Sequence, residues 1–323
     1  MYRLVKFPSA KIVRYLSSIL TLVLWLLLVL PSPAYAWNKA GHMVTGSIAY
    51  SELQKNDPQA LASVINLLKQ NSDLYDKWLS QVNQNANSTL NPDQILFMQA
   101  ARWSDDIRTR PQLSHPKWHY IDFPYKPASQ PASVSVEEPD PENLLTAFQE
   151  NLERVRISNN DSEKAIALSW LFHLTGDVHQ PLHTTSLFAT EYPQGDRGGN
   201  LFHIKVKQNS KPINLHKFWD DLILGSENIR TVRNRATQLR LNPSYSRSRL
   251  SELSDKQIDD WAKPESYELA KKVAYGNGTL TGSPKEESAP VLPRDYLGTA
   301  KRVAERRAVL AGYRLADLLQ QVF

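Results

Sequence analysis

The 323-residue sequence contains no cysteine. This absence excludes a disulfide framework, and it excludes any metal site that depends on thiolate ligands. A metal ion bound by this chain must therefore be held by histidine, aspartate, glutamate or the chain terminus.

A general excess of positive charge is also lacking once the first 36 residues are set aside. The whole sequence has a net charge of +5, but four of its 38 basic residues, Arg3, Lys6, Lys11 and Arg14, lie in that short segment. The remaining 34 basic residues face 33 acidic ones, so residues 37–323 carry a net charge of +1. A broadly basic nucleic-acid-binding surface is not evident, and any attraction for phosphates must be local.

The first 36 residues are predicted to be a signal peptide. After the cationic start comes the apolar run YLSSILTLVLWLLLVL, and Ala-Tyr-Ala at 34–36 fits the small-x-small rule for cleavage. The alternative is an uncleaved membrane anchor, because the run is only slightly shorter than the roughly 20 residues of a spanning helix. The Pro-Ser-Pro break at 31–33 favours cleavage. We therefore expect an exported chain of residues 37–323, periplasmic or secreted, without stable membrane association.

Helical periodicity dominates this exported part. The expected helices are 42–54, 58–70, 92–107, 141–157, 162–180, 215–224, 255–275 and 294–321. Strand-like alternation is confined to 201–206, which follows a Gly-Gly turn typical of a hairpin, and to 119–123. This periodicity predicts a mostly α fold with one short β-hairpin. Because no repeat or linker separates two cores, we predict one helical domain over 37–323.

The segment WLFHLTGDVHQPLH, residues 170–183, is the most informative stretch. His173 and Asp177 are four residues apart, so on a helix they point in directions about 40° apart. Pro181 ends or bends that helix, which lets His183 leave the helical path and approach the same region. A second His-x-x-x-Asp pair follows later in the chain, at His216 and Asp220.

Two such pairs and a third histidine are what a borderline divalent ion such as zinc requires, namely neutral imidazoles and carboxylates. A single pair is more often a hydrogen bond or ion pair on the helix surface. Here tryptophan and leucine flank both pairs, and a carboxylate drawn into an apolar environment needs a cation. The pattern therefore favours a metal site.

Two other segments add polar groups near helix ends and strands. Asp105 and Arg108 in ARWSDDIRTR belong to a cluster that is usually a solvated helix end. In KWHYIDF, strand alternation would point His119 to one face and Tyr120 and Asp122 to the other. The first face would supply a metal ligand, and the second a nucleobase clamp, although an aromatic beside an acid is also common in cores.

A tight turn, GDRGGN at 195–200, precedes the expected hairpin. Its glycines allow close backbone approach to a ligand, with Asn200 as a polar contact. By itself, the Gly-Gly pair indicates only a turn.

Taken in order, these motifs resemble one family. WNKAGH at 37–42, WSDDIR, WHYID, FHLTGDVHQPLH, GGN and NLHKFWD occur in this chain in the order seen in the zinc-dependent single-strand nucleases and 3′-nucleotidases of the S1/P1 type. The resemblance spans nearly all of residues 37–323. It implies a mostly helical fold shared with zinc phospholipase C, and three zinc ions at the bottom of a cleft.

Nine residues would hold these zinc ions if the family's ligands are carried over motif by motif. The resemblance assigns Asp105, His119, His173 and Asp177 to one zinc, and His183, His216 and Asp220 to a second. The third zinc would bind the free amino group and carbonyl oxygen of Trp37 together with His42, and would share Asp177 with the first. Only cleavage before Trp37 frees that amino group. Three zinc ions and three aspartates leave a local charge of roughly +3, which would attract phosphate.

The resemblance also implies substrate contacts and a mechanism. Tyr120 and Asp122 stand where the family has its base pocket, Asn200 falls in its substrate-binding turn, and Arg108 matches an arginine near the scissile phosphate. The expected reaction is attack of a zinc-bound hydroxide, oriented by Asp105, on the phosphorus of single-stranded DNA or RNA, which releases 5′-nucleotides; 3′-nucleotides would be further substrates. The metal and Arg108 would stabilise the charge that develops on the phosphate oxygens.

Two other functions remain open at this point. A zinc phospholipase C would have the same fold and a similar metal set, although Tyr120, Asp122 and the Gly-Gly-Asn turn favour nucleotides. A non-catalytic exported zinc-binding protein would have similar ligands, but no need for Arg108 or a base clamp. Eukaryotic members of the family use disulfides, so the lack of cysteine indicates a bacterial relative. We expect a monomer.

Overall fold

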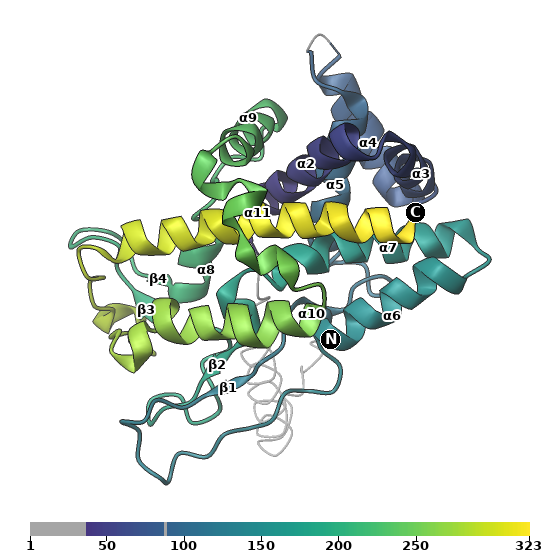
Figure 1. Ribbon diagram of the computed structural model, residues 1–323. Helices are drawn as coiled ribbons and strands as arrows, with labels where there is room; N and C mark the ends of the chain where they lie inside the picture. Colours follow the sequence, from purple (N-terminus) through teal and green to yellow (C-terminus); the bar gives the residue numbers. More distant parts are fainter. Residues whose placement is uncertain (1–36, 87–88) are drawn as a thin grey trace, which may run out of the picture. The chain divides into compact units, whose positions relative to one another are not determined.

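Helices form most of the chain in the computed structural model, which describes residues 37–86 and 89–323. The longer helices are α2 (Lys39–Asn56), α3 (Pro58–Leu68), α4 (Ser72–Gln84), α5 (Pro92–Asp106), α6 (Leu144–Ile157), α7 (Asp161–Asp177), α9 (Ile229–Arg240) and α11 (Tyr296–Val322). Two short helices are α8 (Leu215–Asp220) and α10 (Ile258–Asp260). The predicted mostly α fold is confirmed (Figure 1). The predicted signal peptide and its alternative, a membrane anchor, lie outside the described residues.

Side-chain caps explain where several of these helices begin. The Asp57 carboxylate accepts a hydrogen bond from the Ala60 amide at 2.9 Å, and Pro58 takes the first helical position, where no amide hydrogen is needed. At the start of α6, the Asn143 side chain accepts from the Thr146 amide while Thr146 Oγ1 accepts from the Asn143 amide. This reciprocal capping box satisfies two amides that the helix itself leaves without partners.

Two helices were not expected from the sequence. Helix α4 buries Leu74 and packs Trp78 and Val82, each four residues further on, against the core. Helix α9 buries Ile229, Val232, Ala236 and Leu239, which recur at helical spacing. Both helices therefore have an apolar face that the sequence analysis overlooked.

Several predicted boundaries are corrected. The helix expected at 162–180 ends at Asp177, and the one expected at 215–224 ends at Asp220. The helix expected at 255–275 begins as the single turn of α10 and continues as π-helical segments, Trp261–Tyr267 and Ala270–Ala274. Pro264 lies inside the first of these segments, and a proline removes one backbone donor from a helix interior.

Strands are few and short. β3 (His203–Ile204) pairs antiparallel with β4 (Ile213–Asn214), which confirms the hairpin expected after the Gly-Gly turn. β1 (Pro124–Tyr125) pairs in parallel with β2 (Ser186–Leu187). The strand expected at 119–123 is wrong, because His119 ends a 3₁₀ turn and the chain then runs extended without a regular ladder.

That extended segment nevertheless lies against the segment that follows α7. The Ile121 amide donates to the His183 carbonyl at 2.8 Å, and the Ser186 amide donates to the Phe123 carbonyl at 3.0 Å. These bonds join two parts of the chain about sixty residues apart, and they place His119 and Tyr120 near His183.

Helix α2 runs through the interior, packed against α5 and α11 (Figure 1). Two glycines allow this close packing. A Cβ atom at Gly46 would lie 2.5 Å from the Phe97 carbonyl oxygen of α5, and one at Gly312 of α11 would lie 2.6 Å from Ile48. These two contacts hold α2 closely against α5 and α11.

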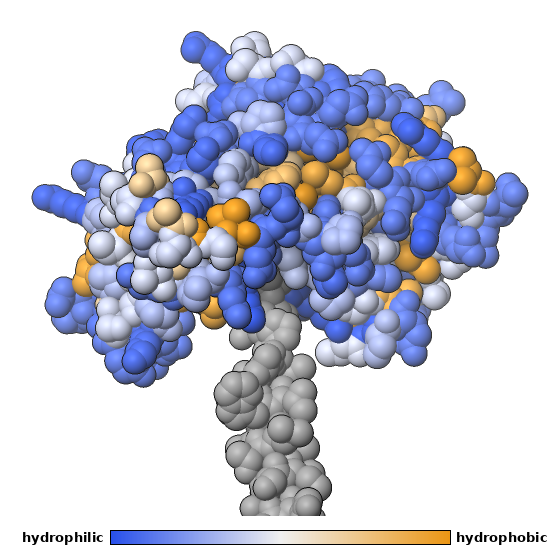
Figure 2. Space-filling model, turned by 90° about the horizontal axis from the view of Figure 1, so that it is seen from below, coloured by the Kyte–Doolittle hydropathy of each residue, from blue (hydrophilic) through white to orange (hydrophobic). Residues whose placement is uncertain are grey.

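The face in Figure 2 is largely hydrophilic, with hydrophobic residues in separate patches. Among the described residues, no helix combines the length and the apolar character needed to cross a bilayer.

Candidate metal centre

Three groups of buried histidines and aspartates meet where the N-terminal end of α2, the C-terminal ends of α5 and α7, helix α8 and two 3₁₀ turns come together. Within each group, the potential ligand atoms lie within 4.8 Å of one another. The groups are His42, His173 and Asp177; Asp105, His119 and His173; and His183, His216 and Asp220. All eight side chains were singled out in the sequence.

His173 is at the centre of the first two groups. Its Nδ1 lies 2.9 Å from the Ala101 carbonyl oxygen, and because a carbonyl only accepts, this nitrogen carries the hydrogen. The Nε2 of this ring then faces His119 Nδ1, 3.0 Å away, and Asp177 Oδ2, 3.2 Å away. His119 Nδ1 also lies 3.2 Å from that oxygen. Three potential ligand atoms from two chain segments thus converge on one point.

Asp177 is fully buried at the end of α7. Burial opposes its ionisation, but the His173 charge and hydrogen bonds from His119, His173 and His42 outweigh burial and hold the pKa of Asp177 well below its ordinary value. The surroundings therefore favour a charged carboxylate in the interior, as a metal ligand must be.

Asp105, near the end of α5, completes the second group. Its Oδ1 lies 2.7 Å from the Arg108 guanidinium and accepts a second bond from Arg108 Nε at 3.0 Å. Burial would raise the pKa of Asp105, but the charges of His173 and Arg108 lower it to about 2. Its Oδ2 has no hydrogen-bond partner among the described residues. Burial, followed by the Arg108 charge, lowers the pKa of His119 to about 4.

His183 and His216 form the core of the third group. His183 lies in the 3₁₀ turn Pro181–Thr184, and its Nδ1 donates to the His119 carbonyl at 2.5 Å. The Nδ1 of His216, in α8, donates to the Gly198 carbonyl at 2.7 Å. Both rings therefore present Nε2, and these two nitrogens lie 3.0 Å apart. Two lone pairs at this separation repel each other unless a cation or a proton lies between them.

Asp220 lies next to these rings, with Oδ2 3.7 Å from His216 Nε2. Its Oδ1 accepts a hydrogen bond from the Gln180 amide at 2.8 Å. Burial raises the pKa of Asp220 well above its ordinary value, and the Gln180 hydrogen bond only partly opposes this effect. A bound cation would reverse the balance and stabilise the carboxylate.

His42 approaches from α2. Its Nε2 lies 3.2 Å from Asp177 Oδ1, and its ring stacks on His173 with 3.9 Å between the ring centres. Burial and the His173 charge lower the pKa of His42, so the neutral ring is favoured. Apart from this contact of Nε2 with Asp177, the ring nitrogens of His42 have no hydrogen-bond partner in the part of the chain that the structure describes. Gly176 makes the approach possible, because a Cβ there would lie 2.6 Å from His42 Nδ1.

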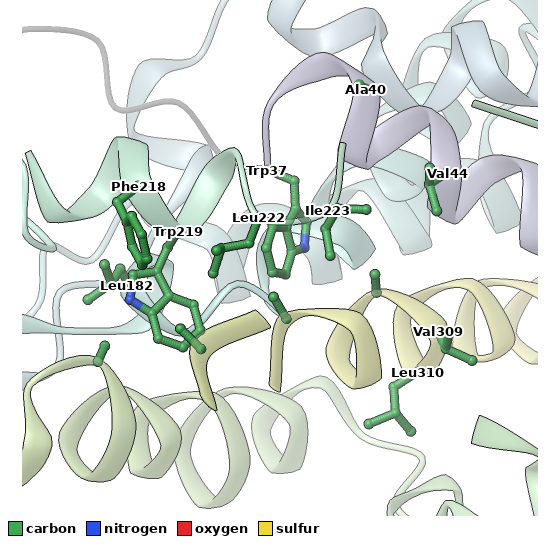
Figure 3. Close-up of a cluster of buried hydrophobic side chains, with 14 of the residues drawn as sticks. Trp37, Ala40, Val44, Leu182, Phe218, Trp219, Leu222, Ile223, Val309 and Leu310 are labelled. Carbon is green, nitrogen blue, oxygen red and sulfur yellow. The ribbon is translucent and has the colours of Figure 1, made fainter. Parts of the chain in front are cut away.

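Trp37 is anchored close to α8. Its indole is buried, and Figure 3 shows it beside Leu222 and Ile223, in the same hydrophobic cluster. The Asn38 amide donates to the Asp220 carbonyl at 3.3 Å, and the Asn38 side chain donates to the Leu224 carbonyl. The backbone at the predicted cleavage site is thereby bound to the helix that carries two of the candidate ligands.

The donor set fits zinc. It consists of imidazole nitrogens and carboxylate oxygens, and three of the five histidines have their Nδ1 on a backbone carbonyl. Such bonds fix the tautomer and orientation of ligating histidines in known metal sites. Asp105 Oδ2, which is buried and has no hydrogen-bond partner among the described residues, and the two Nε2 atoms of His183 and His216, 3.0 Å apart, are placed where they could coordinate a cation.

The predicted base-binding residues lie at the edge of the centre. Burial raises the pKa of Asp122 to about 7; the Asp196 charge adds to the increase, and Arg197 opposes it. Burial and the Asp122 charge raise the pKa of Tyr120, which is partly exposed. Asn200 is also partly exposed, and its Nδ2 donates to the Arg197 carbonyl at 2.8 Å. Asp122 is thus electrostatically coupled to the turn that contains Asn200.

Several positioning residues were missed in the sequence. Gln180 binds Asp220, Gly176 leaves room for His42, and the Gly198 carbonyl orients His216. Gly198 has a φ of 60°, and a Cβ there would lie 2.3 Å from the Leu182 carbonyl oxygen. Its presence in a Gly-Gly turn was the only signal, because the partner segments are distant in the sequence.

His179 and His115 lie outside the centre and have structural partners. His179 is buried; its Nδ1 donates to the Thr175 carbonyl at 2.7 Å, and its Nε2 accepts from Arg314 at 2.9 Å. This agrees with a supporting position rather than a ligand. His115 stacks on Trp118 with 3.7 Å between the ring centres.

Comparison with known proteins identifies similar sequences. The model of the S1/P1 nuclease family matches residues 37–323. Endonuclease 3 of Arabidopsis thaliana is 26% identical over 315 residues, which cover 90% of each chain. Endonuclease 5 of the same plant is 31% identical over 192 residues, covering 56% of this chain and 57% of that protein. Nuclease S1 of Aspergillus oryzae is 27% identical over 199 residues, covering 60% and 56%.

Proposed function

The chain belongs to the S1/P1 nuclease family and is a nuclease, and from this premise we propose that it is an exported zinc-dependent endonuclease. Its substrates are single-stranded DNA and RNA, which it hydrolyses to 5′-nucleotides, and it also removes phosphate from 3′-nucleotides. The observation that carries the proposal is the convergence of eight buried histidine and aspartate side chains, several of them with lone pairs that lack a donor.

Three zinc ions are assigned to these residues. One is held by Asp105, His119, His173 and Asp177, and a second by His183, His216 and Asp220. The third is held by the amino group and carbonyl oxygen of Trp37, by His42 and by Asp177. Support comes from the two separate oxygens of Asp177, since Oδ2 lies 3.2 Å from His119 and His173 while Oδ1 lies 3.2 Å from His42.

Bound zinc supplies positive charge for the phosphate and lowers the pKa of water towards neutrality. Asp105 orients the attacking water through Oδ2, the oxygen without a partner among the described residues. Its Oδ1 holds the Arg108 guanidinium. Arg108 in turn donates to a non-bridging phosphate oxygen and stabilises the charge that develops there.

Tyr120 and Asp122 bind the base. A partly exposed aromatic ring offers a stacking surface, and a carboxyl group whose pKa is about 7 both donates and accepts hydrogen bonds near neutral pH. Asn200 contributes a polar contact from the neighbouring turn. Single strands are preferred because a base must leave its stack to reach these side chains, and a paired base pays the additional free energy of unpairing.

Export prepares the site in this proposal. Cleavage after Ala36 frees the amino group of Trp37, and the mature protein is a monomer in the periplasm or outside the cell. A zinc phospholipase C would use a similar donor set, but the family match and the Tyr120 and Asp122 pair favour nucleotides.

One set of assays tests the proposal. Single-stranded DNA, RNA, 3′-AMP and phosphatidylcholine are each incubated with the protein that begins at Trp37, with and without a chelator. We expect 5′-nucleotides and phosphate, both abolished by the chelator. Release of phosphocholine instead would establish a phospholipase. Bound zinc without any hydrolysis would establish a zinc-binding protein.

A further inference from the structure

One segment of the chain is strongly basic although the protein as a whole is not. Residues 228–251 contain six arginines and no acidic residue. Residues 37–323 carry a net charge of +1, of which this segment contributes +6, so the remainder of the exported chain carries −5. A positive charge concentrated in this way on a mildly acidic protein creates a local attraction for anions.

Half of these arginines have structural partners. Arg235 pairs with Glu305 at 2.6 Å, Arg240 lies 3.5 Å from Glu52, and Arg247 contacts both Glu52 and Asp317 at 2.9 Å. These pairs join α9 and the turn after it to α2 and α11. The positive charges of these three arginines are therefore neutralised by carboxylates of the same chain.

Arg230 and Arg233 of α9 are different. Arg230 is exposed and Arg233 is partly exposed, and neither forms an ion pair within residues 37–86 and 89–323. The Arg233 guanidinium contacts only the neighbouring Asn234 side chain, at 3.3 Å. Their positive charges are therefore available to an external anion.

Arg233 lines a groove between α2, the start of α5 and α9, with a volume of about 590 Å³. The other lining residues are uncharged polar ones: Ser51, Gln54, Gln94, Asn234, Thr237 and Gln238. The lining contains no acidic residue. Amide and hydroxyl groups provide donors and acceptors for sugars and base edges, and arginine provides a charged donor for phosphate.

We propose that this groove, with Arg233 in its lining and Arg230 about one helical turn earlier on α9 (together called the rim arginines), binds the part of a single-stranded nucleic acid that lies outside the catalytic centre. The positive rim complements the phosphate backbone, and the uncharged lining tolerates any sequence. The choice of a nucleic acid as the ligand of this groove rests on the proposed function. The groove contains none of the candidate zinc ligands and none of the predicted base-binding residues.

The distance between the groove and the catalytic centre sets the minimum length of a strand that contacts both. Ser51 and Gln54 lie nine and twelve residues after His42 on α2, which is about 14 to 18 Å along the helix axis at 1.5 Å per residue. At about 3.4 Å per stacked nucleotide, a strand must extend at least four or five nucleotides beyond the cleaved bond. Short substrates therefore do not reach the groove.

The test compares two double variants of the protein that begins at Trp37. R230Q/R233Q removes the two rim charges. R154Q/R156Q removes two exposed arginine charges from the last turn of α6 and serves as the matched control. Binding of a 30-nucleotide oligothymidylate with phosphorothioate linkages, which resist hydrolysis, is measured by fluorescence anisotropy over a range of salt concentrations.

We expect R230Q/R233Q to weaken binding and to reduce the slope of log K against log[salt] by about 1.4, as for two lost phosphate contacts on a single strand. R230K/R233K should restore binding. The KM for hydrolysis of the 30-nucleotide thymidylate should rise in R230Q/R233Q, while the KM values for TpT and 3′-AMP should not change.

Unchanged binding in R230Q/R233Q, or an equal loss in both double variants, overturns the inference. Loss of binding to phosphatidylglycerol vesicles with unchanged oligothymidylate binding overturns it in favour of a membrane contact. If the protein hydrolyses none of the substrates, the proposed function is refuted. The inference about the groove is still tested in that case, because anisotropy measures oligothymidylate binding without hydrolysis.

Discussion

His183 Nε2 and His216 Nε2 lie 3.0 Å apart in the interior, although 33 residues separate the two histidines in the sequence. Each ring donates its Nδ1 hydrogen to a backbone carbonyl, so both rings present a lone pair to the same point. A metal ion or a proton between the two nitrogens would stabilise this arrangement.

Removal of zinc should destabilise the folded protein. Each site that zinc occupies at about 1,000 times its dissociation constant stabilises the native state by about 4 kcal/mol. A chelator should therefore lower the thermal unfolding midpoint, and zinc but not magnesium should restore it, because magnesium prefers oxygen ligands. Calorimetry with and without chelator measures the change, and identical midpoints would contradict a zinc site between His183 and His216.

Substitution of Gly176 by alanine should displace His42. The new Cβ would lie 2.6 Å from His42 Nδ1, so the ring must move away from Asp177. We expect zinc affinity at this site to fall about 10- to 100-fold, the range seen when a residue that supports a metal ligand is changed. Zinc content after dialysis against a weak chelator is the measurement.

Gly225→Ala is the matched control for that substitution. A Cβ at Gly225 meets no atom within 4 Å, so zinc content should remain as in the unsubstituted protein. Gly225 lies in a bend and Gly176 in α7; alanine in a helix interior is normally more favourable than glycine by about 0.5–1 kcal/mol, so a loss of zinc in Gly176→Ala would not come from a lower helix propensity. Retention of all zinc in Gly176→Ala would show that His42 is not a ligand.

One additional residue before Trp37 should remove most activity and one zinc ion. The added peptide bond converts the amino group into an amide, which no longer has a lone pair suited to a metal. Trp37 itself should stay buried, since its indole packs in the core beside Leu222 and Ile223. Metal analysis and hydrolysis assays compare this protein with one that begins at Trp37, and full retention of both properties would refute the assignment.

Arg108→Ala should lower kcat about 10²- to 10³-fold, as expected for the loss of one donor that stabilises charge in the transition state. The KM should change less, because the interaction strengthens as negative charge develops. Arg110→Ala is the control. Arg110 lies two residues further on, is half exposed and pairs with Asp73 instead of Asp105. Equal effects of the two substitutions would argue against a catalytic contact by Arg108.

Asp122 should make stability depend on pH. Its pKa rises from the ordinary value of 3.8 to about 7 on folding, chiefly because it is buried. The folded state therefore favours the protonated form, and the resulting cost in stability is absent below about pH 4, grows through the window from pH 4 to 7 and is complete above it. An asparagine side chain does not ionise, so Asp122→Asn does not carry this pH-dependent cost in stability.

Unfolding midpoints of the two proteins should accordingly coincide near pH 4, where both side chains are neutral. The variant should become the more stable protein as the pH rises towards 7. A constant difference between the midpoints at all pH values would contradict a raised pKa of Asp122.

The sequence anticipated the larger helices because their apolar residues recur at helical spacing and because caps such as Asp57 with Pro58 mark their starts. Helices α4 and α9 were overlooked although their apolar residues also recur at helical spacing. The sequence also predicted a strand at 119–123, where the structure has a 3₁₀ turn followed by extended chain. Short elements of this kind depend on the neighbours that supply their hydrogen bonds.

The sequence by itself determined the chemistry that this protein can use: histidines and aspartates without cysteine, and two His-x-x-x-Asp pairs at helical spacing. Only the tertiary structure decided which of these atoms face each other. His119 meets His173 across 54 residues, and His42 reaches Asp177 because Gly176 lacks a side chain. The spacing of residues on a helix determines the relative directions of side chains only within one or two turns. The contacts between His119 and His173 and between His42 and Asp177 depend instead on how α2, α5, α7 and α8 pack.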